Sequence, residues 1–204
     1  RAGRLTKELK SGSMTFLPII EILQGDVTGY VSTNLISITD GQVYFSTALF
    51  NKGVRPPIDF GLSVSRIGNK GQWPAMKDVS KMLRLEYLQY QELLQMTQLR
   101  SGGLSKDSEQ RMKRGEALSF LLTQHKNRPI SVPEQIFCLI ALSNGLLDGL
   151  SAEEVRKYRG EVQAFVASAD PALLQGLLDT KKVDDTSKER FLNIIRNYFQ
   201  TKAA

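Results

Sequence analysis

The stretch GLSVSRIG, residues 61–68, ends a short alternating segment on an arginine. Leu62 and Val64 alternate with serines, which predicts a β-strand, and Arg66 follows directly. One explanation of this arginine is a solvated strand end. The other is a cation presented to phosphate, because a guanidinium is permanently charged and binds two oxygens at once. The octamer alone leaves both explanations open.

Few other side chains offer nucleophilic or metal chemistry. The sequence has one cysteine, Cys138, within the apolar segment IFCLIAL, and one histidine, His125. We expect Cys138 to be a buried, inert thiol. One residue of each kind excludes a Cys/His zinc site, and a catalytic Ser-His or Cys-His pair would have to rely on His125 alone. A standard P-loop, G-x-x-x-x-G-K followed by Ser or Thr, is absent from the sequence, and we predict no metal site.

The net charge of +6 raises the question of nucleic-acid binding. The cations are interleaved with acids, as in SKDSEQRMKRGE (105–116), a pattern typical of a solvated helix face. The sequence carries no zinc-finger spacing and no aromatic-basic ribonucleoprotein motif. A basic helical interaction module that binds RNA or DNA stays open as an alternative, and it predicts a steep dependence of binding on salt.

Length and composition fit one large domain or two small ones. The chain has 204 residues, of which 41% are hydrophobic, enough for an ordinary core. Because the sequence begins with Arg1 rather than Met, we expect a fragment or a processed product. The longest apolar stretch, 136–150, is interrupted by polar residues and is too short to span a bilayer, and no amino-terminal run resembles a signal peptide. We therefore expect the chain itself to be soluble.

The amino-terminal part is predicted to form strands and turns, namely TFLPIIEIL (15–23), LISI (35–38), QVYF (42–45) and the segment that leads to Arg66. The first run is apolar on both faces, which favours a central strand of a covered sheet, with a strand end or bulge near Pro18. Short strands without helical crossovers do not make a covered sheet. Residues 1–71 therefore look like part of a nucleotide-binding domain.

The carboxy-terminal part has the period of helices. From Met76 to Leu94 apolar residues recur every three or four positions, and Gly102 and Gly103 end this stripe. We expect the helix after Glu134 to be the buried centre of a bundle of about five or six helices. Helix starts are predicted at Ser105, at Asp170 followed by Pro171, and at three capping boxes, Ser131 with Glu134, Ser151 with Glu154 and Thr186 with Glu189.

Four segments resemble, in order and spacing, the carboxy-terminal part of the alpha subunit of F-type ATP synthases: GSMTFLPIIE (12–21), TNLISITDGQVYF (33–45), LFNKGVRPPIDFGLSVSRIG (49–68) and PISVPEQI (129–136). ISITDGQ and GLSVSR together are specific for alpha, compared with beta or vacuolar relatives. The resemblance covers the whole chain and is looser in the helical half. A vacuolar- or secretion-type rotary ATPase with the same arginine is the alternative, and one motif upstream would decide between them.

The resemblance implies a fold and membership of a multisubunit rotary complex. The fold is an α/β remnant of a P-loop nucleotide-binding domain, residues 1–71, followed by an all-α helical bundle, residues 72–204. Alpha subunits alternate with beta subunits in a ring around the gamma shaft, which the turn at 98–110 would face, and they bind nucleotide without turning it over. The implied partners are beta, gamma and other alpha subunits, with no nucleic acid. The implied location is a peripheral membrane complex on the cytoplasmic face of a bacterial inner membrane, or the equivalent organelle face.

The resemblance also implies roles for three residues at the opening motif and nearby. Arg66 would be an arginine finger that reaches in trans into the catalytic site of beta, and Ser37 and Val64 match positions lining that interface. The complex would use ATP or ADP with Mg²⁺ for ATP synthesis and hydrolysis coupled to transport of protons or sodium. The isolated chain is expected to be inactive and to hold no cofactor.

A second set of residues matches the surroundings of the adenine in the alpha subunit's own nucleotide site. LFNKGVRP matches the base-side loop, so Phe50, Arg55 and Pro56 are candidate wall residues. LTQHKNRP (122–129) matches a segment that usually carries two glutamines. Gln124 keeps the first glutamine, and Lys126 stands in place of the second, a departure at the adenine contact.

Overall fold

A computed structural model describes residues 2–22, 25–99 and 105–203 of the chain. It divides into two compact units, Arg1–Gln42 and Val43–Ala204. The domain boundary expected between residues 71 and 72 stays a prediction. Within the described ranges we find no helix whose length and apolar character would let it cross a bilayer.

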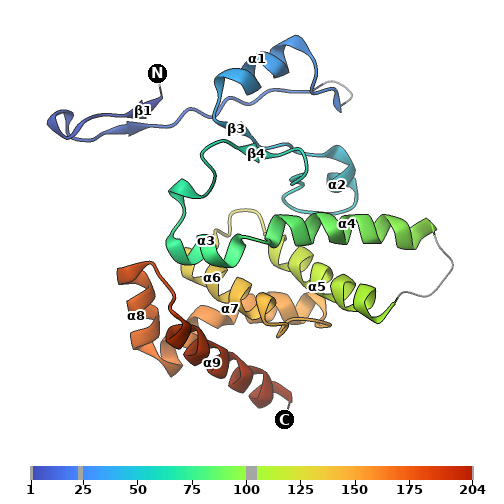
Figure 1. The fold of residues 1–204 in the computed structure, drawn as a ribbon, viewed down its shortest axis with the longest axis vertical. Coiled ribbons are helices and arrows are strands. Elements are labelled where there is room, and N and C mark those ends of the chain that lie inside the picture. Colours follow the sequence, from blue (N-terminus) through green and yellow to red (C-terminus); the bar gives the residue numbers. More distant parts are fainter. Residues whose placement is uncertain (1, 23–24, 100–104, 204) are drawn as a thin grey trace. The chain divides into compact units, whose positions relative to one another are not determined.

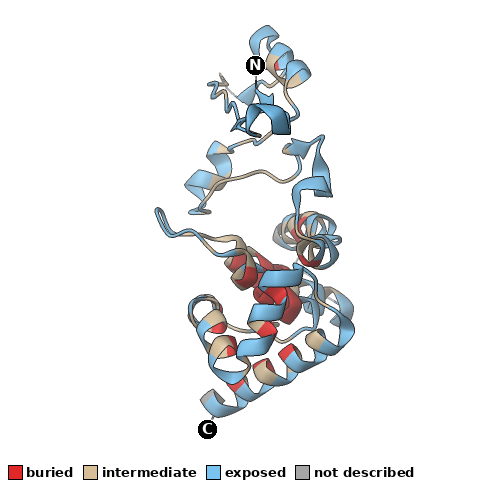
Figure 2. Ribbon diagram, turned by 90° about the vertical axis from the view of Figure 1, so that its left-hand side faces the viewer, coloured by how far each residue is buried: buried red, intermediate tan, exposed pale blue. Residues whose placement is uncertain are grey.

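The first unit has short elements and little buried surface (Figures 1 and 2). In its hairpin, Gly3 pairs with Met14 and Arg4 with Ser13 in antiparallel register. Lys10 and Ser11, both with positive φ, make the turn of this hairpin. The elements of the unit are β1 (Gly3–Arg4), η1 (Lys7–Leu9), β2 (Ser13–Met14), α1 (Tyr30–Ile38) and β3 (Gly41–Gln42).

The predicted central strand at 15–23 is wrong for residues 15–22, and residue 23 lies outside the described residues. Residues 15–22 have no regular secondary structure, and Ile19 is 96% exposed. A strand buried on both faces needs hydrogen-bonding neighbours and covering helices. In the described part of the first unit, the strands are only two residues long and supply neither.

The predicted strand at 35–38 is also wrong, because these residues form the last turn of α1. The amide of Thr39 closes the helix by donating to the carbonyl of Leu35 at 3.1 Å. A run of four apolar residues has no period that distinguishes a strand from a helix. The predicted strand at 42–45 survives only in part, as β3 (Gly41–Gln42) and a single antiparallel bridge between Phe45 and Ile58.

The second unit begins with an irregular segment and continues as a helical bundle, as predicted. The irregular segment holds α2 (Thr47–Asn51), β4 (Val64–Ser65) and η3 (Gly68–Gly71). The described part of the bundle contains seven helices, more than the five or six expected: α3 (Pro74–Ser80), α4 (Leu83–Leu99), α5 (Lys106–Leu122), α6 (Val132–Ser143), α7 (Ala152–Ala169), α8 (Pro171–Thr180) and α9 (Asp185–Ala203).

One extra helix comes from the apolar stripe that begins at Met76. The stripe predicts a single helix, but α3 ends at Ser80 and α4 begins at Leu83. The apolar period continues across this break, so the pattern alone does not reveal it. The expected end of the stripe at Gly102 and Gly103 lies outside the described residues.

Most predicted helix starts are confirmed. The side chains of Ser105, Ser131 and Asp170 each accept a hydrogen bond from the amide three residues on, and Ser151 forms a complete capping box with Glu154. The predicted box at Thr186 is wrong. Its place is taken by Asp184, whose carboxylate accepts from the amide of Ser187 at 3.1 Å, because α9 already begins at Asp185.

The core of the second unit surrounds α6, which is buried along nearly all of its length (Figure 2). The ring of Phe137 stacks on that of Phe191 from α9, with centroids 4.7 Å apart and planes 14° apart. Cys138 is 3% exposed, so the expectation of a buried thiol is confirmed. This core includes Tyr87 of α4 and Tyr158 of α7, and both helices contact segments described next.

Helices α4 and α5 pack closely against each other. A Cβ atom placed on Gly115 of α5 would lie 2.3 Å from Cγ of Tyr90 on α4. The ring of Tyr90 therefore occupies the space that any other residue at 115 would need. Figure 1 shows the two helices side by side.

Candidate functional site

Arg66 stands directly after β4 and is exposed. The turn that follows it is fixed locally, because the amide of Gly68 donates to Oγ of Ser65 at 3.0 Å. Gly68 has a φ of +58°, in the left-handed region that favours glycine. The predicted strand 61–66 is thus reduced to β4 and a turn, with the guanidinium at its carboxyl end.

The segment before β4 is held by a set of hydrogen bonds around Asp59. Its carboxylate accepts from the amides of Gly61 at 2.8 Å and Leu62 at 3.1 Å. Its own amide donates to the carbonyl of Tyr44 at 2.9 Å, and its carbonyl accepts from the hydroxyl of Ser63 at 2.6 Å. The same hydroxyl oxygen accepts from the amide of Tyr44 at 3.0 Å. These bonds set the backbone path toward Arg66.

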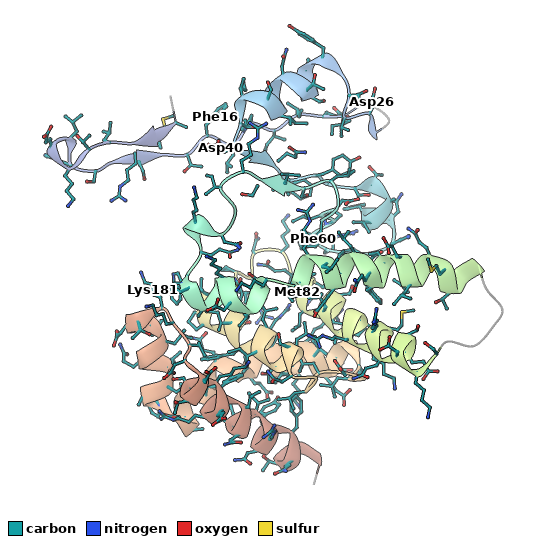
Figure 3. The ribbon with its side chains drawn as sticks, in the orientation of Figure 1. Phe16, Asp26, Asp40, Phe60, Met82 and Lys181 are labelled. Atoms are coloured by element: carbon teal, nitrogen blue, oxygen red, sulfur yellow. The ribbon has the colours of Figure 1, made fainter. Side chains whose placement is uncertain are left out.

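This segment is anchored on the first two turns of α4. The ring of Phe60, labelled in Figure 3, meets that of Tyr87 edge-on, with centroids 5.0 Å apart. Arg84 donates from Nη2 to the carbonyl of Gly61 at 3.2 Å. Burial, and next the carboxylate of Asp59, raise the pKa of Tyr87. The backbone that leads to Arg66 is therefore tied to the helical bundle.

Ser37 and Val64 were expected to line one interface with Arg66. Val64 lies two residues before Arg66 in β4 and is 45% exposed. Ser37 lies in the first unit, near the end of α1, where its hydroxyl donates to the carbonyl of Asn34 at 2.7 Å. Their common interface stays a prediction.

The four residues expected near the adenine are brought together, and we call them the base-side cluster: Phe50, Arg55, Pro56 and Gln124. The guanidinium carbon of Arg55 lies 3.7 Å from the centroid of the Phe50 ring. Nη1 of Arg55 donates to the carbonyls of Phe50 at 2.7 Å and Val54 at 2.9 Å. The amide of Gln124 donates to the carbonyl of Arg55 at 2.8 Å, and Pro56 follows Arg55 in the chain. Arg55 and Gln124, 69 positions apart in the chain, thus meet in one place.

The loop that carries Gln124 turns back on itself. Nε2 of Gln124 donates to the carbonyl of Arg128 at 2.8 Å, and Asn127 takes a left-handed conformation with a φ of 60°. Lys126 is exposed on this loop. An ammonium group donates hydrogen bonds but accepts none, so Lys126 cannot offer the acceptor that an amide offers.

Two residues of α7 that the sequence analysis did not single out contact this loop at both ends. Nη1 of Arg159 donates to the carbonyls of Leu121 at 3.1 Å and Thr123 at 2.5 Å. The hydroxyl of Ser131 donates to Oε1 of Gln163 at 2.6 Å. These partners are more than thirty residues apart in the chain, so no local pattern connects them.

Within the described residues, no group of three or more His, Cys, Asp or Glu side chains is arranged to hold a metal ion. We therefore assign no ligand of Mg²⁺ to these residues. The candidate functional groups are therefore the guanidinium of Arg66 at a strand end and the side chains of the base-side cluster.

Comparisons with known proteins agree with each other. A family model described as the ATP synthase alpha/beta chain, C terminal domain, matches residues 72–198, and one for the ATP synthase alpha/beta family, nucleotide-binding domain, matches residues 1–65. ATP synthase subunit alpha of Aquifex aeolicus (strain VF5) is 44% identical over 190 residues, covering 93% of this chain and 38% of that relative. ATP synthase subunit alpha of Syntrophomonas wolfei is 40% identical over 203 residues, covering 100% of this chain and 40% of that relative. The chain therefore spans about two fifths of the length of these curated relatives.

Proposed function

The chain belongs to the family of F-type ATP synthase alpha subunits, and on that premise we propose that it supplies an arginine finger, Arg66, in trans to the catalytic site of a neighbouring beta subunit. The observation that carries this proposal is the exposed position of Arg66 directly after β4, on a backbone anchored to α4. Ser37 and Val64 would line the same interface.

Arginine suits the chemistry of phosphoryl transfer. Negative charge spreads over the equatorial oxygens of the transferred phosphoryl group, and a guanidinium can bind two of them at once. A cation supplied in trans increases the rate by roughly a thousandfold or more. The hydrogen bonds around Asp59 support the proposal because a finger is effective only when it is held in place before the reaction.

The base-side cluster is proposed to be the adenine wall of the alpha subunit's own, non-catalytic nucleotide site. Phe50 offers an aromatic face and Gln124 an amide, the groups that stack on a purine and bond its edge. ATP or ADP with Mg²⁺ would be the ligand in the full complex. Most of its phosphate contacts would come from a P-loop, a motif that these 204 residues lack.

The proposed partners are beta subunits, the gamma shaft and other alpha subunits in the ring. The proposed activity of the assembly is ATP synthesis and hydrolysis coupled to ion transport. Its proposed location is a peripheral complex on the cytoplasmic face of a bacterial inner membrane, or the equivalent organelle face. All of these features belong to an assembly much larger than the chain.

Arg66→Ala in a reassembled alpha–beta ring tests the proposal. We expect ATP hydrolysis with all sites filled to fall by about a thousandfold, because the transition-state charge loses its cation. Nucleotide binding should change little, since the finger contributes mainly in the transition state. Arg66→Lys should recover little activity, because an ammonium is a point charge without the planar fork. Steady-state hydrolysis and equilibrium nucleotide binding are the two measurements.

The matched control is Lys70→Ala, which removes an exposed cation four residues away in η3. This variant should keep the hydrolysis rate of the wild type. Turnover by Arg66→Ala at the wild-type rate would remove Arg66 from the mechanism. Equal losses in both variants would point to general surface charge instead.

A further inference from the structure

We propose that Arg159 is the positioning residue of the base-side cluster, and that it acts by fixing the peptide plane between Thr123 and Gln124. The inference rests on the proposed nucleotide site but concerns a residue remote in sequence from it. Arg159 lies on α7. The residues that it positions lie directly after α5, at the end of α2 and in the segment that follows α2. All of them belong to the second unit.

The first step is the carboxyl end of α5. The last carbonyls of a helix have no partner within the helix. Here the carbonyls of Ser119 and Phe120 accept from the hydroxyl and the amide of Thr123, at 3.0 and 3.2 Å. The carbonyl of Leu121 accepts from Nη1 of Arg159 at 3.1 Å. A cation at this helix end also interacts favourably with the helix dipole.

The second step is the peptide that follows. The same Nη1 atom bonds the carbonyl of Thr123 at 2.5 Å, while the amide of Gln124 donates to the carbonyl of Arg55 at 2.8 Å. That carbonyl and that amide belong to one planar peptide group and, in a trans peptide, point in opposite directions. The plane is therefore held from both sides, by Arg159 on one and by Arg55 on the other.

The third step links this plane to the aromatic ring. The carbonyl of Arg55 accepts from the amide of Gln124. The guanidinium of Arg55 covers the ring of Phe50 and donates to the carbonyl of Phe50 at 2.7 Å. A rotation of the plane between Thr123 and Gln124 would break the bond to Arg55. It would also displace the side chain of Gln124, which starts from the same backbone.

The far end of the loop is held from the same helix. Gln163, four residues after Arg159 and hence on the same face of α7, accepts from the hydroxyl of Ser131 at 2.6 Å. Burial raises the pKa of Glu134, at the start of α6, while Arg159 acts to lower it. This acid balances the charge of Arg159 beside the loop. One face of α7 thus fixes both ends of the segment between α5 and α6.

The test separates base recognition from phosphate binding. It uses an alpha–beta ring in which the alpha subunit contains this chain. The P-loop lysines of the beta subunits are replaced to weaken nucleotide binding there, so that the measured binding comes from the alpha sites. The ligands are Mg-ATP and inorganic magnesium tripolyphosphate, which has the phosphates but no base. We expect Arg159→Ala to raise the Kd for Mg-ATP by about tenfold, because the peptide plane loses its charge-assisted hydrogen bond at the carbonyl of Thr123. The Kd for tripolyphosphate should stay unchanged.

Three further variants sharpen the comparison. Arg156→Ala removes an exposed cation one turn earlier on α7 and should bind both ligands like the wild type. Arg159→Lys keeps the charge and a donor, so it should recover part of the affinity for Mg-ATP, and it serves the same comparison if the alanine variant does not assemble. Adding Arg159→Ala to Gln124→Ala should cause a smaller loss of affinity than Arg159→Ala causes alone, because part of its effect passes through the Gln124 side chain.

The outcomes are distinct. Loss of affinity for Mg-ATP alone supports the inference. If the wild-type ring and the Arg159→Ala ring prefer Mg-ATP over tripolyphosphate to the same extent, the inference is overturned. The proposed nucleotide site is then left intact. Equal weakening of both ligands would reduce Arg159 to a structural residue. A wild-type ring without any preference for Mg-ATP would overturn the proposed adenine wall and the inference together.

Discussion

At the scale of single residues, the candidate functional groups owe their positions to other side chains. Arg66 follows a strand of two residues. The path of the backbone before it is set by the five hydrogen bonds that the backbone and carboxylate of Asp59 form with Tyr44, Gly61, Leu62 and Ser63. Gln124 is placed by its peptide plane, which is bonded on one side by Arg159. In both cases hydrogen bonds to polar partners help to set the position, together with the ring contact of Phe60 and Tyr87 before Arg66.

Cys138 allows a prediction of pH dependence at this scale. Burial raises its pKa above the ordinary thiol value of 9.0, and Glu134 adds to this. Below that value both folded and unfolded thiols are protonated, and the stability is unaffected. Above it the unfolded thiol ionises while the folded one stays neutral, so the free energy of unfolding should fall by up to about 1.4 kcal/mol per pH unit.

Chemical denaturation between about pH 8 and pH 10 measures this effect. Cys138→Ala is the control, since it lacks the thiol and should lose less stability over the same range. The comparison stays at or below the pH where buried tyrosines add their own contribution, because a tyrosine in the unfolded chain ionises only near its ordinary pKa of 10.0. Parallel pH profiles of the two proteins would contradict the prediction.

Residue-scale features are predictable from sequence when the partner is local. Cys138 sits in an apolar run that predicts its burial, and Ser151 and Glu154 form the predicted capping box because both hydrogen bonds span three residues. Arg159 bonds carbonyls 36 and 38 residues earlier in the chain. Arg159 is half-buried in the structure. No pattern in the residues around it in the sequence indicates which carbonyls it bonds.

At the scale of elements, the pairing of α4 and α5 depends on one small residue. Gly115 costs helix stability on its own, because glycine is less favourable than alanine in a helix by about 1 kcal/mol. The tyrosine ring that fills its space recovers this cost by close packing, since a Cβ would lie 2.3 Å from Cγ of Tyr90. Steric fit here outweighs helix propensity.

Gly115→Ala should therefore destabilise the second unit although alanine favours helices. We expect the free energy of unfolding to fall by about 1–3 kcal/mol, the usual cost of overpacking a core. Gly160→Ala is the matched control, because a Cβ at that position of α7 meets nothing within 4 Å. It should raise stability by up to about 1 kcal/mol. Thermal unfolding followed by circular dichroism compares the two, and a stabilised Gly115→Ala would show that Tyr90 can move aside.

Helices are predictable at this scale because their period extends over many residues. The strands at 15–23 and 35–38 fail for different reasons. Residues 35–38 are too few to show any period, and they lie in α1. Residues 15–22 have the composition of a buried strand, but composition does not supply the neighbouring strands that a sheet requires.

At the scale of the whole molecule, burial is unequal between the two units. The second unit contains the buried helix α6 and the stacked rings of Phe137 and Phe191. The first exposes large apolar side chains, among them Ile19 at 96% and Leu17 at 81%. Contiguous exposed apolar surface is typical of sites where a protein contacts other protein.

The chain by itself should neither hydrolyse ATP nor bind it tightly. A P-loop supplies the backbone amides and the lysine that hold the phosphates, and the 204 residues contain none. Isothermal titration calorimetry of the purified chain with Mg-ATP is the measurement, with Arg55→Ala as a check that any weak heat comes from the base-side cluster. Micromolar binding would contradict the prediction, and salt-sensitive binding of RNA would favour the basic interaction module.

The anchoring of Phe60 and Gly61 on α4 has a mechanical consequence. α4 has 17 residues and is a rod about 25 Å long. Its far end is at Leu99, while its near end holds the segment before Arg66 through Arg84 and Tyr87. A push on the far end would therefore tilt the near end as a lever does. The segment before Arg66 would then move together with α4 rather than as an independent loop.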